Sequence, residues 1–91
     1  MYKYFVLLRT DPTRTNDVVQ KLRNLPERPL EGVRLYYTMN CFGTWDLAIW
    51  FEAEEHDNVI DFVHNKICPI PGVIETHLVP TTPIKEYINW E

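Results

Sequence analysis

A weak internal repeat constrains the possible folds of this 91-residue chain more than any other feature. When the sequence is compared with itself after a shift of forty residues, each half reads as a strand, a polar turn, a helix, a proline break and a Gly-Val pair that opens another strand. Two such units predict the order β-α-β-β-α-β, the split βαβ arrangement of a ferredoxin-like α+β domain. The matching pairs are Asp17 with Asp57, Val19 with Val59, Leu22 with Phe62, Pro29 with Pro69, Gly32 with Gly72, and Val33 with Val73.

Hydrophobic periodicity and turn residues place the elements within this order. Strands are expected at residues 2–9, 33–40, 45–52 and 73–79, and helices at residues 16–25 and 55–67. Thr15 or Asn16 is expected to cap the first helix, because short polar side chains accept hydrogen bonds from the free N–H groups there. The third strand is apolar on both faces, as is typical of a strand that is covered on both sides.

Side-chain spacing also assigns faces to these elements. Along the second strand, alternation puts one set of side chains on each face of the sheet. One set is Val33, Leu35, Tyr37 and Met39, and the other is Arg34, Tyr36 and Thr38. In the second helix, the positions expected to face inward are Val59, Ile60, Val63 and Ile67.

The predicted sheet has both helices on one face and leaves the other face uncovered. That face carries large residues from residues 2–8 and 45–50, in a chain that is 45% hydrophobic and 13% aromatic. A domain this short has only a modest core, and excess apolar surface is commonly covered by another subunit. The sequence therefore predicts a homodimer that packs sheet against sheet, a dimeric α/β barrel.

Charge and hydropathy exclude several functions. The net charge is −4 and the basic residues are dispersed among acids, so no direct nucleic-acid contact is expected. No apolar run approaches the length of a membrane span, and residues 1–10 read as a strand rather than as a signal peptide. We therefore expect a cytoplasmic protein without membrane contact. Residues 81–91 contain Pro83 and read as an extension or an edge strand.

The stretch from Cys41 to Trp50, CFGTWDLAIW, suggests a site for an amino acid. Gly43 allows φ > 0 and a close approach of the backbone, so N–H groups near it can meet a carboxylate. Asp46 is a natural acceptor for an ammonium group, and the Thr44 hydroxyl can assist it. Structural roles explain the same residues: Gly43 as a hairpin glycine and Asp46 as an acid that binds turn amides.

Three segments in order resemble the ligand-binding half, or RAM domain, of the Lrp/AsnC family of leucine-responsive and asparagine regulators. They are YFVLLRTDPTRTNDVVQKL, GTWDLAIWFEAE and FVHNKICPIPGVIETHLV, and the resemblance covers residues 2–80. We take residues 1–80 as this domain and residues 81–91 as an extension. Because the chain begins at the first strand, it resembles members that lack the helix-turn-helix domain.

The resemblance implies a function and a site. It implies sheet-to-sheet dimers, rings of dimers such as octamers, and amino acids bound between dimers near the G-x-aromatic-D turn. Trp45 stands where the family usually has tyrosine or phenylalanine, which enlarges the aromatic wall. The residues expected to bind the ligand are Gly43, Thr44, Trp45 and Asp46, with Met39, Asn40, Cys41, Thr76 and His77 as further candidates. A helix-turn-helix paralogue is an implied partner, through which the module would modulate transcription indirectly.

Two other functions stay open on the sequence. The chain also fits a small dimeric α/β-barrel enzyme, such as a cofactor-independent monooxygenase, which needs polar groups between sheet and helices. His64 is the one candidate near that layer. A purely structural oligomer without ligand is the other possibility. The three histidines lack chelating spacing and no nucleotide, hydrolase or zincin motif occurs, so we expect no catalytic residue, metal or cofactor.

Overall fold

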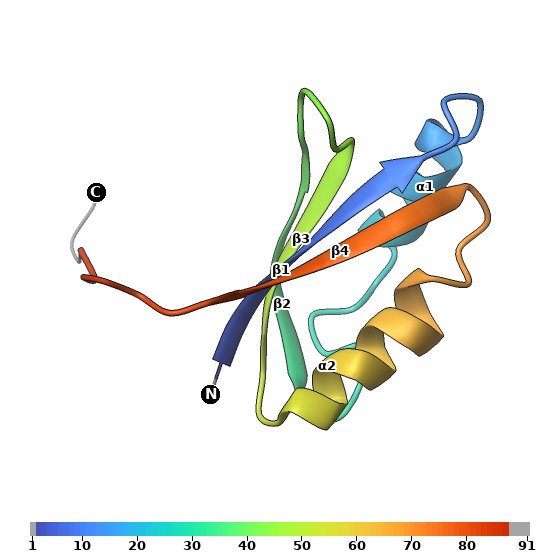
Figure 1. Ribbon diagram of the computed structural model, residues 1–91. Coiled ribbons are helices and arrows are strands. Elements are labelled where there is room, and N and C mark those ends of the chain that lie inside the picture. Colours follow the sequence, from blue (N-terminus) through green and yellow to red (C-terminus); the bar gives the residue numbers. More distant parts are fainter. Residues whose placement is uncertain (1, 88–91) are drawn as a thin grey trace.

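The computed structural model describes residues 2–87 and has the predicted order of elements (Figure 1). The elements are β1 (Tyr2–Thr10), α1 (Thr15–Arg23), β2 (Val33–Asn40), β3 (Leu47–Ala53), α2 (His56–Phe62), the π-helical η1 (Val63–Ile67) and β4 (Val73–Thr81). Four antiparallel strands form one sheet in the order β2-β3-β1-β4. The predicted α+β, ferredoxin-like fold is confirmed. No helix in residues 2–87 is long and apolar enough to cross a membrane.

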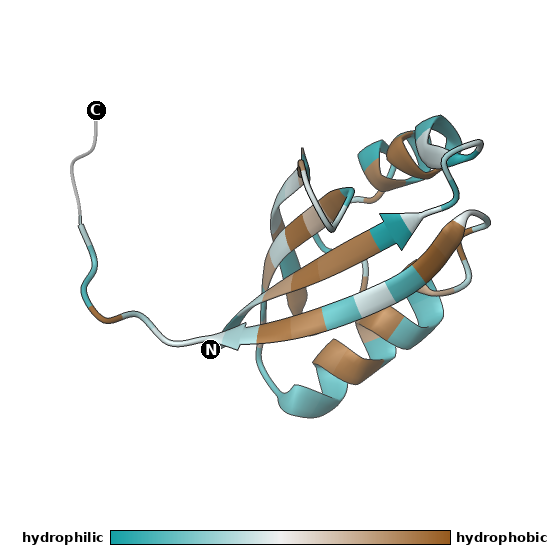
Figure 2. Cartoon of the chain, turned by 45° about the horizontal axis from the view of Figure 1, so that its top comes forward, coloured by the Kyte–Doolittle hydropathy of each residue, from teal (hydrophilic) through white to brown (hydrophobic). Residues whose placement is uncertain are grey.

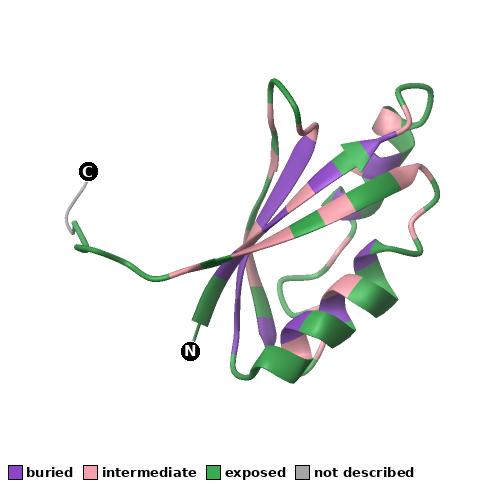
Figure 3. Cartoon of the chain, viewed as in Figure 1, coloured by how far each residue is buried: buried purple, intermediate pink, exposed green. Residues whose placement is uncertain are grey.

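The core lies between the helices and one face of the sheet. In Figure 1 both helices lie on the same side of the sheet. Side chains at alternate positions of β1 and β3 pair across the strands and point to this side, as Val6 does opposite Ile49. Phe51 and Phe62 are fully buried, and their ring centroids are 5.0 Å apart. Figure 3 shows that β3 is buried along nearly its whole length, which agrees with a central strand.

The first helix begins differently from the expected cap. Arg14 occupies the N-cap position and its side chain makes no capping hydrogen bond. Thr15 is the first helical residue, and its hydroxyl lies 2.7 Å from the Thr10 hydroxyl and 3.2 Å from the Asp11 carbonyl oxygen. The predicted cap was wrong, because Thr15 lies inside the helix and its hydroxyl bonds Thr10 and Asp11 at the end of β1.

The buried side of the second helix differs from the side predicted by periodicity. Asn58 Oδ1 accepts a hydrogen bond of 3.0 Å from the Glu55 N–H and closes the first turn. Val59 and Ile67 are buried as predicted, but Ile60 is 48% exposed. Phe62 fills the inward position instead, since a helical residue next to Val59 lies about 100° around the axis.

A bulge in β2 changes the faces that simple alternation predicts. The pairing with β3 shifts between Leu35 and Tyr37, so Tyr37 lies opposite Trp50. Val33 and Leu35 precede the bulge and face the helices, whereas Tyr37 and Met39 follow it and lie on the opposite face, so the four residues do not share one face as predicted. An extra residue in one strand reverses the alternation beyond it, which sequence spacing alone does not reveal.

The sheet face opposite the helices, here called the open face, carries aromatic and apolar side chains. Phe5 pairs with Trp50 in the neighbouring strand and with Val79 on its other side, and the Phe5 and Trp50 ring centroids are 4.5 Å apart. Figure 2 shows apolar bands along the strands and a chain segment that leaves the sheet after β4. That segment, residues 82–87, is here called the arm. Residues 88–91, Trp90 included, lie outside the described residues.

Candidate functional site

The hairpin of residues 41–46 joins β2 to β3 and presents the candidate site at its tip. Gly43 has φ of 120°, so the positive angle expected from sequence is present. A Cβ placed on Gly43 would meet no described atom within 4 Å, and Phe42 beside it is 97% exposed. The tip therefore projects into solvent in the single chain, and a pocket at the tip needs walls from another chain.

Backbone hydrogen bonds anchor the base of this hairpin. The Cys41 N–H donates to the Asp46 carbonyl oxygen at 2.8 Å, and the Asp46 N–H donates to the Leu8 carbonyl oxygen at 2.9 Å. The hairpin is therefore joined to β1, the strand at the centre of the sheet beside β3. Thr44 is exposed in the turn between these anchors.

The Asp46 carboxylate holds the end of β1. Its Oδ2 accepts hydrogen bonds from the Thr10 N–H at 2.8 Å and from the Thr10 hydroxyl at 3.3 Å. Thr10 is only 4% exposed, and without Asp46 its N–H would be a buried donor lacking this acceptor. Asp46 thus has a structural role, but its carboxylate binds the end of β1 rather than the amides of its own turn. The second oxygen, Oδ1, makes no hydrogen bond within residues 2–87, so the charged group keeps an acceptor for a ligand.

The other candidate residues divide into two groups. The Trp45 and His77 rings are stacked, with centroids 5.7 Å apart and planes 18° apart, so His77 of β4 joins the hairpin. Thr76 does not: its Oγ1 lies 3.9 Å from Cys68 Sγ, beyond the last turn of η1. Cys68 is exposed, whereas Cys41 is partly buried.

Met39 and Asn40 lie at the end of β2, before the hairpin. They line a cavity of about 110 Å³ between β2, β3 and α1. Asn40 pairs with Leu47 at the start of β3, and Met39 pairs with Ala48. Asn40 therefore shares the sheet face of Leu47, where α1 packs, whereas Met39 shares the open face with Ala48.

Hydrogen bonding perturbs one carboxyl group near this end of the sheet. Asp11 follows β1, and its Oδ1 accepts hydrogen bonds from the Thr13 N–H at 2.9 Å and the Thr13 hydroxyl at 2.8 Å. These bonds favour the ionised form and lower the pKa of Asp11 below its ordinary value of 3.8, with a smaller contribution from the Arg14 charge. This turn fixes the path from β1 into α1.

The layer between sheet and helices is filled. Its fully buried side chains are apolar, and within residues 2–87 the buried polar residues are Thr10 and Glu52. His64 is exposed on η1 and does not enter the layer. No cluster of three or more metal-ligating side chains occurs in the described part of the chain.

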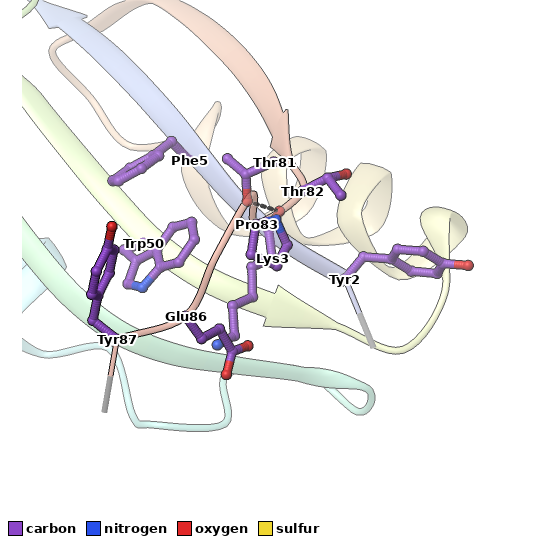
Figure 4. A pocket seen from close by; sticks show the side chains of 9 residues that line it. All are labelled: Tyr2, Lys3, Phe5, Trp50, Thr81, Thr82, Pro83, Glu86 and Tyr87. Carbon is purple, nitrogen blue, oxygen red and sulfur yellow. Dashed lines mark hydrogen bonds between the residues drawn. The ribbon is translucent and has the colours of Figure 1, made fainter. Parts of the chain in front are cut away.

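A second cavity lies on the open face and was not identified from sequence. It has a volume of about 750 Å³ and lies between the sheet and the arm (Figure 4). Its lining residues are Tyr2, Lys3, Phe5 and Trp50 from the sheet, and Thr81, Thr82, Pro83, Glu86 and Tyr87 from the end of β4 and the arm. Alternation in β1 and β3 indicates most of the sheet half of this lining, but the path of the arm, which contains Pro83, cannot be predicted from spacing.

Comparison with known proteins places the chain by its fold. No protein-family model matches the sequence, and no characterised protein matches it at a significant level. Several solved structures are similar, and three of them are described here. FFRP-DM1 superposes with a TM-score of 0.73 at 22% identity, over 90% of this chain and 100% of that one. TTHA0845 from Thermus thermophilus superposes with a TM-score of 0.78 at 20% identity, over 96% of this chain and 100% of that one. MtbAldR superposes with a TM-score of 0.74 at 9% identity, over 99% of this chain and 57% of that one. The chain has the fold of these structures, which is the fold that resemblance to the Lrp/AsnC ligand-binding half implies.

Proposed function

We propose that this chain is a regulatory module that binds an amino acid and oligomerises, without catalysing a reaction. The observation that carries the proposal is the hairpin of residues 41–46, in which Gly43 at the tip has a positive φ and Asp46 at the base keeps a free carboxylate oxygen. The ferredoxin-like fold and the resemblance to Lrp/AsnC regulators support it. The mostly apolar side chains buried between the sheet and the helices favour this module over a monooxygenase-like enzyme.

The proposed ligand is a zwitterion held by the hairpin. Backbone N–H groups of residues 43–45 bind its carboxylate, because the glycine lets the backbone approach closely. Asp46 Oδ1 accepts from the ammonium group, and the stacked Trp45 and His77 rings form one wall for the side chain. Met39, Asn40, Cys41, Thr44 and Thr76 complete the set of candidate ligand-binding residues. A neighbouring dimer closes the site.

Assembly links ligand binding to regulation in this proposal. Dimers form through the open face and associate into rings such as octamers, with ligand at the contacts between dimers. A helix-turn-helix paralogue enters the same assemblies and carries them to DNA. The ligand favours one assembly only to the extent that it binds this assembly more tightly than the others.

Calorimetric titration with the twenty standard amino acids tests the binding step. We expect one amino acid or a small related group to bind the wild-type protein. Asp46→Asn is the matched variant, because the amide oxygen still accepts from the Thr10 N–H while the negative charge is lost. A charge-assisted hydrogen bond contributes about 1.5–3 kcal/mol, so binding should weaken at least tenfold. Equal titrations for the two proteins would remove the role of Asp46, and no heat with any amino acid would refute the proposed ligand class.

Co-expression with a helix-turn-helix paralogue tests the partner. Differently tagged chains are expected to purify together as mixed oligomers if they share the open-face and ring contacts. A Leu7→Lys variant, which puts a charge on the open face opposite Ala48, should purify alone. If wild type and variant both fail to exchange subunits with the paralogue, co-assembly is refuted while amino-acid binding is unaffected.

A further inference from the structure

The arm leaves the sheet at a defined point. Thr81 is the last residue that pairs with β1, opposite Lys3, and its hydroxyl donates a hydrogen bond of 2.8 Å to the Lys3 carbonyl oxygen. Pro83 follows, and its lack of an N–H suits the end of strand pairing. Figures 1 and 2 show the arm extending away from the helices, on the side of the open face.

The arm is not packed on its own chain. All six of its residues are exposed, Ile84 is fully exposed, and Tyr87 is 66% exposed. An apolar side chain in this position gains no burial, so the arm has little to hold it here in an isolated chain. Ile84 and Tyr87 therefore need a surface that the described residues do not supply.

The space under the arm has an aromatic lining on both sides. Figure 4 shows the Trp50 and Phe5 rings on the sheet and Tyr87 on the arm, with the cavity of about 750 Å³ between them. Lys3 of β1 and Glu86 of the arm also line this cavity. A cavity of this volume with aromatic walls suits the apolar side chains of another polypeptide.

The dimensions of the sheet indicate what the arm adds to an interface. Four strands of 7 to 9 residues, spaced about 4.8 Å apart with a rise of ~3.4 Å per residue, cover on the order of 520 Å² in projection. Stable interfaces usually cover roughly 600–1,000 Å² on each partner. The open face alone therefore provides an interface near the low end of this range, and an aromatic side chain such as Tyr87 adds roughly 150–250 Å² when buried.

The charges of the open face also suit a second copy of the chain. Lys3 and Arg9 lie in β1, and Glu75 in β4 makes an exposed ion pair of 2.7 Å with Arg9. The arm carries Lys85 and Glu86, again one charge of each sign. A surface with both signs can be complementary to itself across a two-fold axis, whereas a surface of one sign repels its copy.

We infer that the arm of each copy packs onto the open face of a second copy. The second copy occupies the space between the first copy's arm and the first copy's sheet. Ile84 and Tyr87 then bury against the second copy, and the cavity at Trp50 is completed by residues of both chains. By two-fold symmetry each chain gives one arm and receives one. This inference rests on the sheet-to-sheet assembly of the proposed function and specifies how the interface is completed.

Photo-crosslinking from the arm tests which chain it contacts. In a Cys41→Ser, Cys68→Ser background, the cysteine of an Ile84→Cys variant is labelled with benzophenone maleimide and irradiated. Mixed ¹⁵N-labelled and unlabelled chains, refolded together, distinguish bonds between chains from bonds within one chain by mass spectrometry. We expect mixed-isotope products attached to strands of the open face. Products confined to one chain would show that the arm covers its own sheet and would overturn the inference.

Sedimentation equilibrium measures the contribution of the arm to association. An Ile84→Asp, Tyr87→Asp variant should raise the dimer dissociation constant at least tenfold, with an unchanged circular dichroism spectrum because the arm makes no strand pairs. Ile60→Asp is the control, since Ile60 is an exposed apolar residue on α2, and it should change the constant less than twofold. Equal constants for wild type and arm variant would refute the arm contact, whereas amino-acid binding is measured independently in the calorimetric test. A wild-type protein that stays monomeric would refute both the arm contact and the proposed assembly.

Discussion

Two glycines with positive φ lie in opposite surroundings, and the difference shows what each one does. Gly43 has φ of 120° and open space where a Cβ would lie. Gly72 has φ of 103°, and a Cβ there would lie 2.8 Å from Arg14 Cβ and 3.0 Å from Val18 Cγ2. Gly72 is needed for close packing of the β4 entry on α1, whereas only the backbone angle requires glycine at Gly43.

Alanine substitution at these two glycines should separate strain from packing. Gly43→Ala should lower the free energy of unfolding by about 1–2 kcal/mol, the usual cost of a strained backbone angle. Gly72→Ala should cost more, roughly 3 kcal/mol or above, because overpacking adds to the same strain. Urea denaturation of both variants measures this difference. Equal losses would show that the contacts at Gly72 relax without cost.

The Asp11 turn should make stability depend on pH in the acid range. Its pKa is lowered in the folded protein by the Thr13 hydrogen bonds, so the ionised carboxylate contributes stability above the unfolded value of 3.8. That contribution is lost as the pH falls below 3.8 through the folded pKa. Asp11→Asn should therefore be less stable than wild type at neutral pH and approach it near pH ~3, as measured by urea denaturation at several pH values. A constant difference across this range would contradict the assignment.

At the scale of elements, local irregularities decide which side chains reach the core. The β2 bulge moves Tyr37 and Met39 to the open face, and the π-helical turns of η1 bring Ile67 inward after Phe62. The element order and the approximate bounds were predictable, because hydrophobic periodicity and prolines mark them. The bulge and the π-helix were not, because both arise when long-range packing outweighs local spacing.

Core truncations in α2 should reflect this revised helix face. Phe62→Ala should lower the free energy of unfolding by about 3–5 kcal/mol, because Phe62 is fully buried against Phe51 and leaves a cavity. Ile60→Ala should cost less than about 1 kcal/mol, since Ile60 is 48% exposed. Chemical denaturation of both variants tests the assignment, and a reversed order would support the face originally expected from periodicity.

At the scale of the whole molecule, one face of the sheet is covered by the helices and the other is uncovered. The helices cover one face of the sheet, while the opposite face presents Phe5, Trp50 and Val79 together with the unpacked arm. Covering several hundred Å² of such surface contributes several kcal/mol at about 25 cal/mol per Å², before the costs of association. This imbalance is the physical basis for the proposed assembly and for the arm contact.

Thermal unfolding should therefore depend on protein concentration. Because association stabilises the folded chain by mass action, the Tm of wild type should rise over about a hundredfold increase in concentration. Leu7→Lys places a charge on the open face and should make the Tm nearly independent of concentration. Differential scanning calorimetry checks both proteins. An invariant wild-type Tm would contradict assembly through the open face.

The sequence by itself determined the order of elements, the central position of β3, the uncovered apolar face and the positive φ of Gly43, because these follow from periodicity, prolines and the conformational freedom of glycine. Only the tertiary structure decided that one oxygen of Asp46 binds Thr10, and that His77 stacks on Trp45 while Thr76 lies near Cys68. It also decided that the arm remains exposed and forms a cavity with its own sheet. These features depend on contacts between residues far apart in the chain, and hydrogen bonds and packing at that range leave no periodic trace in the sequence.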